Sequence, residues 1–205
     1  MIETEVRKYK LIGLTPMLGS QPANEKVRTT FVASKAPQIM DDEEIIENLD
    51  QQGLTVFYRD KNGNPILMDY QVKGFFKSAG RALSKQNGVA NPVSKVDQFV
   101  FVTPRQIAIK RHGETVTEPD GIRERPLLAM TMQGQRTCTA ASEYIDDWEI
   151  TIEVEIVVNS GTAKSKPVTF EILEDWLDYG FYNGLGRWRN AGNGRFRWEE
   201  IKDGE

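Results

Sequence analysis

Residues 148–158 alternate between apolar and polar side chains from Trp148 to Ile156, and this pattern constrains the fold more than any other part of the chain. A side-chain period of two is that of a β-strand with one face in the core and the other in water. The apolar positions are Trp148, Ile150, Ile152, Val154 and Ile156, with Glu149, Thr151, Glu153 and Glu155 between them. The sequence therefore predicts a sheet with one covered face and one open face.

Two other segments predict helices that cover such a sheet. Residues 69–87 and 170–179 place apolar side chains at helical spacing, and residues 41–52 begin with acids that suit a helix N-terminus. Strands are expected at 5–14, 54–59, 65–68, 99–102, 105–110, 127–132 and 137–141, and a long irregular loop at 18–37. The fold class that fits is α+β, an antiparallel sheet with helices on one face, in a single domain over residues 1–205.

Composition excludes several classes of site. The 205 residues include one cysteine, Cys138, and one histidine, His112, so neither an intrachain disulfide nor a Cys/His zinc site is expected. The acidic residues at 41–44 and 146–147 are interpreted as a helix start and a turn, so we expect no metal and no cofactor. No signal peptide and no apolar run of roughly 18 residues is present, which predicts a cytoplasmic protein without membrane contact.

A glycine- and arginine-rich segment at 184–197 is the first candidate binding site. Its Gly-x-Gly pairs stand at 184–186 and 192–194, and arginines stand at 187, 189, 195 and 197. Exposed N–H groups of such a loop form an anion-binding concavity, and guanidinium groups add phosphate contacts. Trp188 and Phe196 are candidates for stacking on bases. The alternative is a glycine-rich hairpin with its aromatic residues in the core and its arginines in water.

The predicted helix at 69–87 carries a second set of cations. Lys73, Lys77 and Arg81 are spaced four residues apart and therefore share one helix face. Gly74 and Gly80 allow another backbone to approach closely. The alternative is a solvated face opposite the apolar stripe.

Three short segments, in this order, resemble motifs of the RAMP superfamily of CRISPR proteins. Residues 14–20 (LTPMLGS) look like the turn after the first strand of that family. Lys73-Gly74 resembles the Lys-Gly element of the subunits that form the backbone of crRNA effector complexes, with Lys77 where arginine is usual. Residues 184–194 resemble the family's glycine-rich loop. The resemblance implies a ferredoxin-like or RRM-like core with insertions that binds an RNA backbone, in a CRISPR system or as a stand-alone or phage-encoded relative.

Three functions follow, and the first is preferred. The first is non-catalytic binding of RNA or a nucleotide-like anion, within a protein complex or with self-association, at Lys73, Gly74, Lys77, Arg81, Gly184, Gly186, Arg187, Arg189, Gly192, Gly194 and Arg195. The second is docking on another protein, as an inhibitor of a defence complex. The third is a metal-independent RAMP endoribonuclease, in which His112 acts as general acid or base if it lies near the glycine loop.

The distribution of charge is compatible with an anionic ligand. The chain has 26 basic and 30 acidic residues, a net charge of −4. Residues 184–197 hold four arginines and no acid, so the rest of the chain carries −8 (−4 minus +4). An acidic body with one cationic loop predicts a confined anion site rather than a broad basic surface.

Overall fold

The computed structural model describes residues 2–23, 54–131, 134–158 and 165–202, and the side chains of all of these except 127–138. Six elements follow one another as strand, helix, strand, strand, helix, strand: β1 (Thr4–Gly13), α3 (Asp69–Asn87), β7 (Val100–Thr103), β13 (Glu149–Val157), α5 (Phe170–Asp178) and β14 (Phe196–Ile201). Their strands lie in the order β14-β1-β13-β7, with every pair antiparallel. This order is that of the ferredoxin-like βαββαβ fold, so the predicted fold class is confirmed.

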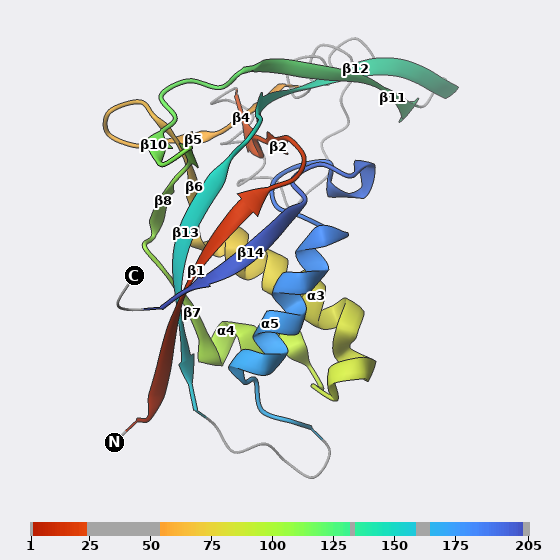
Figure 1. Ribbon diagram of the computed structural model, residues 1–205. Helices are drawn as coiled ribbons and strands as arrows, with labels where there is room; N and C mark the ends of the chain where they lie inside the picture. Colours follow the sequence, from red (N-terminus) through yellow and green to blue (C-terminus); the bar gives the residue numbers. More distant parts are fainter. Residues whose placement is uncertain (1, 24–53, 132–133, 159–164, 203–205) are drawn as a thin grey trace.

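The helices lie on one face of this sheet, as predicted (Figure 1). The inward side chains Ile150, Ile152, Val154 and Ile156 of β13 are at most 2% exposed. Phe75 and Phe76 of α3 and Leu173 and Trp176 of α5 are buried against the same core. The alternation at 148–158 therefore has the physical cause inferred from it, a sheet with one buried face.

Insertions into this core form the rest of the described structure. Between β1 and α3 come β2 (Met17–Leu18), β3 (Gln21–Pro22), β4 (Leu54–Val56), β5 (Tyr58–Arg59) and β6 (Pro65–Met68). Between α3 and β7 lies α4 (Pro92–Phe99), and between β7 and β13 come β8 (Gln106–Ala108), β9 (Lys110–Arg111), β10 (Glu114–Thr115), β11 (Gly121–Thr131) and β12 (Gly134–Ile145). β11 and β12 pair as a long antiparallel hairpin that forms an arm beyond the core sheet (Figure 1).

Several predicted elements differ from the observed ones. α3 has the predicted ends, and Gly88 caps it in the left-handed region at φ 71°. Within the expected loop at 18–37, residues 18, 21 and 22 are in β2 and β3 instead, because they pair with edges of β12 and β4. Only residues 58–59 of the expected strand at 54–59 pair with β6, since β4 joins β12 and β3. α4 was not predicted, and the helix expected at 41–52 lies outside the described residues.

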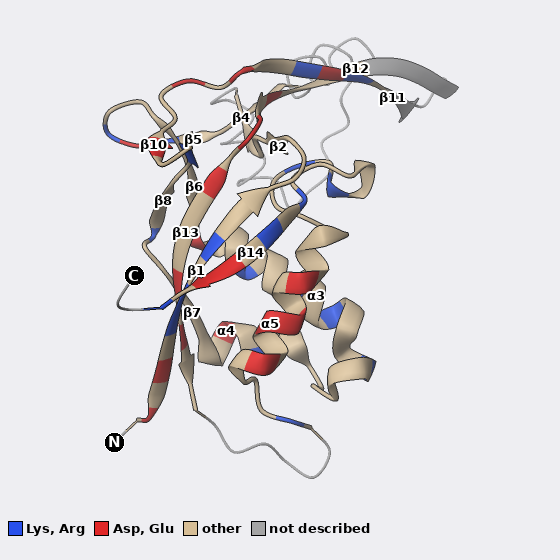
Figure 2. Ribbon diagram, viewed as in Figure 1, with Lys and Arg blue, Asp and Glu red and all other residues tan. Residues whose placement is uncertain are grey.

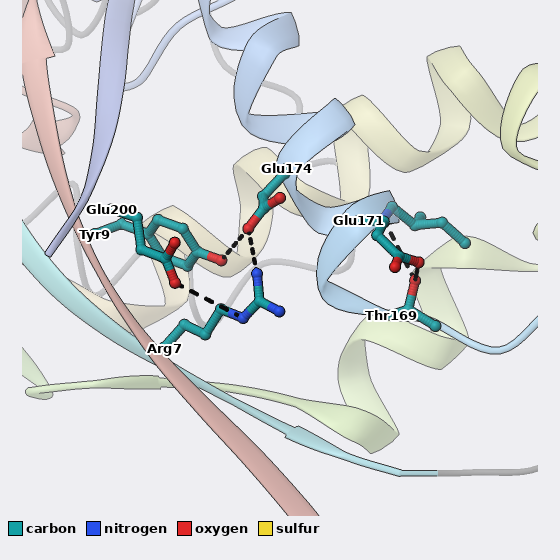
Figure 3. A network of polar contacts seen from close by, with 7 residues as sticks. Arg7, Tyr9, Thr169, Glu171, Glu174 and Glu200 are labelled. Carbon is teal, nitrogen blue, oxygen red and sulfur yellow. Dashed lines mark hydrogen bonds and ion pairs between the residues drawn. The ribbon is translucent and has the colours of Figure 1, made fainter. Parts of the chain in front are cut away.

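A polar network joins α5 to the sheet (Figure 3). Arg7 of β1 donates a hydrogen bond to Glu174 of α5 at 2.8 Å, and the Tyr9 hydroxyl donates to the same carboxylate at 3.0 Å. Burial, together with this hydrogen bond, raises the pKa of Tyr9. The Arg7 guanidinium also lies 3.8 Å from Glu200 of β14. These contacts fix the helix that leads directly into the glycine-rich segment.

Candidate nucleic-acid interface

The glycine-rich loop, residues 184–195, is built on the turn that follows β1. A Cβ on Gly184 would lie 1.7 Å from the carbonyl oxygen of Gly194, so the two glycines permit a backbone approach that other residues forbid. Gly186, at φ 80°, approaches the carbonyl of Leu18 in the same way. Gly184, Gly186 and Gly194 are therefore required by the packing of the loop itself, and Gly192 by its left-handed backbone at φ 81°.

Several main-chain N–H groups of this loop donate hydrogen bonds within the protein. Leu185 donates to Gly194, Arg187 to Leu18 and Gly194 to Pro16, with N to O distances of 2.9, 3.2 and 2.8 Å. The N–H of Arg195 donates to Thr15 Oγ1 at 2.9 Å. Because these donors are occupied, only the remaining N–H groups of the loop and its side chains are available to an anion.

Two of the three segments that resemble RAMP motifs are in contact, and the third lies on the helix whose Gln71 contacts the turn at 14–20. The turn at 14–20 accepts the hydrogen bonds of the glycine-rich loop just described, and its Ser20 Oγ accepts one from Gln71 of α3 at 2.6 Å. Gly74 shares the helix face of Gln71, three residues on, and nothing lies within 4 Å of the position of an added Cβ there. The turn thus stands between the glycine-rich loop and the open side of α3.

Two arginines converge on the indole ring of Trp188. The guanidinium carbon of Arg125, on β11, lies 5.1 Å from the ring centre, and that of Arg187, in the glycine-rich loop, lies 5.8 Å from it. Both are at cation–π distance. Figure 2 shows basic positions on both β11 and the loop. Arg125 is not among the predicted site residues, since β11 begins six residues before the strand expected at 127–132.

The positive charges of Arg125 and Arg187 repel each other in the free protein. Burial lowers the pKa of the Arg187 guanidinium from its usual value, and the charge of Arg125 lowers it further. One nitrogen of Arg187, Nη1, is buried without a hydrogen-bond partner among the described residues. Within that part of the chain, neither guanidinium forms an ion pair with a carboxylate. Two adjacent positive charges without a counter-charge favour an anion.

A third arginine of β11 extends this cluster. Arg123 donates a hydrogen bond to Asn193 Oδ1 of the glycine-rich loop at 3.2 Å and lies over the ring of Tyr144 at 5.0 Å. Residues two apart on a strand share a face, so Arg123 and Arg125 both face the loop. The alternation in Arg123-Glu124-Arg125 is the sequence pattern that could have identified these two arginines as neighbours on one face of a strand. We name Arg123, Arg125, Arg187 and Trp188 the guanidinium cluster.

The other predicted arginines of the loop lie outside the guanidinium cluster. Arg195 is exposed, and its guanidinium lies against Gly192. Arg189 is half-buried in a short 3-10 turn, Arg189–Ala191. Phe196 is 0% exposed and packs against Phe75 and Trp148, so the expectation that it stacks on bases is wrong. The first residue of β14 belongs to the core instead.

The helix cations contact a different part of the molecule. Lys77 forms an ion pair with Asp97 of α4 at 2.5 Å, and the Lys73 ammonium lies 5.1 Å from the ring centre of Phe101 on β7. Phe75, on the opposite side of α3, packs against Phe196. Arg81 is exposed at a depression of about 850 Å³ between α3 and α4. Lys73, Lys77 and Arg81 therefore do not converge with the guanidinium cluster.

His112 lies at the opposite edge of the sheet from the glycine-rich loop. It occupies the turn between β9 and β10, exposed and at φ 50°, whereas the loop leads into β14. The sheet order β10-β9-β13-β1-β14 separates the two edges (Figure 1). The condition for its role as a general acid or base, proximity to the loop, is not met.

Among the described residues, no group of three or more His, Cys, Asp or Glu side chains is arranged to hold a metal ion. In the same part of the chain, no helix is long and apolar enough to cross a membrane.

No known family model matches the sequence, and no curated protein matches it. Solved structures do match. The fold resembles that of a chain in a cryo-EM structure of the type III-B Cmr-beta bound to cognate target RNA. The match has a TM-score of 0.50 and 10% identity, and it covers 98% of this chain and 61% of that one. This chain thus spans about three-fifths of the length of that chain. A chain of a type IV-B CRISPR complex matches with a TM-score of 0.48 and 9% identity, over 98% of this chain and 92% of that one.

Proposed function

We propose that this chain is a non-catalytic RNA-binding protein that holds the phosphate backbone of RNA at the guanidinium cluster, as a member of a CRISPR-like assembly. The observation that carries the proposal is the convergence of Arg125 and Arg187 on Trp188 without a carboxylate partner among the described residues. A phosphate between or beside two guanidinium groups forms charge-assisted hydrogen bonds and relieves their repulsion.

The comparisons support the class of ligand. The similar chain belongs to a structure of Cmr-beta bound to cognate target RNA. The motifs at 14–20 and 184–194, which resemble those of RNA-binding RAMP proteins, are in contact here, and the motif at 73–74 lies on α3, whose Gln71 contacts the first of them.

The path of the RNA extends from the cluster towards α3. Arg189 and Arg195 flank the cluster on the loop, and Gly74 offers an open surface beyond the turn at 14–20. Lys73 is adjacent to Gly74 in sequence, and Lys77 and Arg81 continue along the helix. The glycines Gly184, Gly186, Gly192 and Gly194 shape the loop that presents the arginines.

The direct test is binding of a short labelled single-stranded RNA, measured by fluorescence anisotropy at low salt. Arg187→Gln is expected to weaken binding by about tenfold, since a hydrogen bond to a charged group contributes about 1.5 to 3 kcal/mol. The matched control is Arg197→Gln, because Arg197 is an exposed arginine near the loop that pairs with Glu199 at 3.0 Å. Equal affinities of the two variants would contradict the proposal, as would absence of RNA binding by the unmodified protein.

The same samples test the absence of catalysis. The RNA is expected to be recovered intact after prolonged incubation, with the unmodified protein and with His112→Ala alike. Cleavage that yields a 2′,3′-cyclic phosphate and is lost in His112→Ala would establish the endoribonuclease alternative instead.

A further inference from the structure

Two exposed aromatic side chains stand immediately before the glycine-rich loop. Phe181 is 55% exposed and Tyr182 is 67% exposed. Their rings contact each other edge to face, with centres 5.2 Å apart, and Tyr182 also contacts the ring of Tyr179 at 6.4 Å. A large aromatic side chain buries roughly 150–250 Å² when it is packed, so leaving two of them in water forgoes stabilisation of the fold.

The backbone that carries these rings is firmly held. Residues 179–181 form a 3-10 turn at the end of α5, and the N–H groups of Tyr182 and Asn183 both donate to the carbonyl of Tyr179 at 3.0 Å. A Cβ on Gly180 would lie 2.3 Å from the ring of Phe196, so the turn is packed directly on the core. The exposure of Phe181 and Tyr182 is therefore a fixed feature of the fold.

The charges that follow the rings in the sequence select the kind of partner. Gly184 begins the glycine-rich loop two residues after Tyr182, and Arg187 and Arg189 follow within that loop. Asp178, the acid that precedes the turn, is held by a hydrogen bond from Trp198 Nε1 at 2.8 Å. A ligand that needs both cations and exposed ring faces is a single-stranded nucleic acid, since its phosphates bind the cations and its unpaired bases stack on the rings.

We infer that Phe181 and Tyr182 form a base-stacking platform for single-stranded RNA whose backbone is held at the guanidinium cluster. This inference rests on the proposed function and adds to it that the RNA is single-stranded and has its bases unstacked from one another. A duplex keeps its bases stacked inside and cannot use the platform. The platform thus supplies the base stacking that was predicted for Phe196.

The test compares three ligands of equal length: single-stranded RNA, its duplex, and an abasic ribose-phosphate oligomer. Replacing both rings, with Phe181→Ser and Tyr182→Ser together, is expected to weaken binding of the single strand at least about fivefold, since stacking contributes roughly 1 to 3 kcal/mol per base. Binding of the abasic oligomer, which has phosphates and no bases, is expected to remain unchanged. The unmodified protein is expected to prefer the single strand to the duplex.

Two variants make the result specific. Tyr182→Phe keeps a ring and is expected to retain affinity. Ile2→Ser, at a residue that is 78% exposed and lies near the N-terminus, far from the loop in Figure 1, controls for loss of exposed apolar area and is expected to have no effect.

The outcomes separate the inference from the proposed function. If the unmodified protein binds the single strand and the double serine variant binds it equally well, the platform is wrong while the guanidinium cluster stands. Equal losses for the single strand and the abasic oligomer would also overturn the platform. If the unmodified protein binds none of the three ligands, the proposed function itself fails.

Discussion

The Arg125 guanidinium of β11 lies 5.1 Å from the centre of the Trp188 ring, and this contact joins the β11–β12 arm to the glycine-rich loop. Arg187 approaches the same ring from within the loop. Two positive charges thus lie where the β11–β12 arm meets the loop between α5 and β14 of the ferredoxin-like core. Such an arrangement costs stability in the free protein, as functional sites often do.

Arg187→Met is therefore expected to separate stability from binding. The variant keeps an unbranched apolar side chain and removes a half-buried charge that repels Arg125, so the free energy of unfolding should stay the same or rise by about 1 kcal/mol. RNA affinity should fall in the same variant. Urea denaturation and anisotropy measure the two quantities, and a variant that is clearly less stable would show that Arg187 has a mainly structural role.

Gly184→Ala is expected to disrupt the loop. The added methyl group would overlap the carbonyl of Gly194, which belongs to the backbone and cannot rotate away. We expect a loss of about 3 kcal/mol in the free energy of unfolding, measured by urea denaturation. A stability equal to that of the unmodified protein would mean that the backbones at Gly184 and Gly194 are not packed as described.

Gly74→Ala is the matched change on α3 and is expected to act in the opposite direction. An added methyl group meets nothing within 4 Å, and alanine is favoured over glycine inside a helix by about 1 kcal/mol. The free energy of unfolding should rise by roughly this amount. RNA affinity is expected to fall severalfold, because the methyl group occupies the surface to which we assign the RNA backbone. Unchanged affinity would confine the site to β11 and the glycine-rich loop.

Glu149 is expected to make stability depend on acid pH. The hydrogen-bonded ion pair with Lys10 and the hydrogen bond from the Gly113 N–H lower the pKa of Glu149, although its burial acts in the opposite direction. A carboxyl whose pKa is lower when folded stabilises the protein above the unfolded value of about 4.3, and this contribution is lost as the pH falls through the folded value.

The variant Glu149→Gln tests this sign. Its free energy of unfolding should be lower than that of the unmodified protein by about 1 to 3 kcal/mol at neutral pH. The difference should shrink as the pH falls below about 4.3. A difference in the free energy of unfolding that is constant from neutral to acid pH would contradict the lowered pKa of Glu149.

The elements that the sequence predicts well are those whose own side chains face the core. β13 alternates because the helices cover one face of its sheet, and α3 shows its apolar stripe over about three turns, so their residues suffice to identify them. α4 buries only Pro92 and Val96 over eight residues, which is too little to produce a visible period. The strand order depends on pairings between distant segments, such as β1 with β13, that no local pattern encodes.

The candidate site was predictable only in part, for the same reason. The glycines and arginines at 184–195 are adjacent in sequence, and their pattern identifies the loop. Arg123 and Arg125 join it through an arm more than fifty residues away, and that proximity is a product of the fold. The helix cations were expected beside the loop, yet Lys77 turns to Asp97 because α4, which was not foreseen, packs there.

The salt dependence of RNA binding tests phosphate recognition by the guanidinium cluster most directly. Each phosphate contact to a single strand contributes about 0.7 to the slope of the logarithm of the binding constant against the logarithm of salt concentration. The double variant Arg125→Gln, Arg187→Gln is expected to bind more weakly, with a slope smaller by about 0.7, the value for the one phosphate that the two arginines share. A slope equal to that of the unmodified protein would show that these two arginines do not contact RNA phosphates.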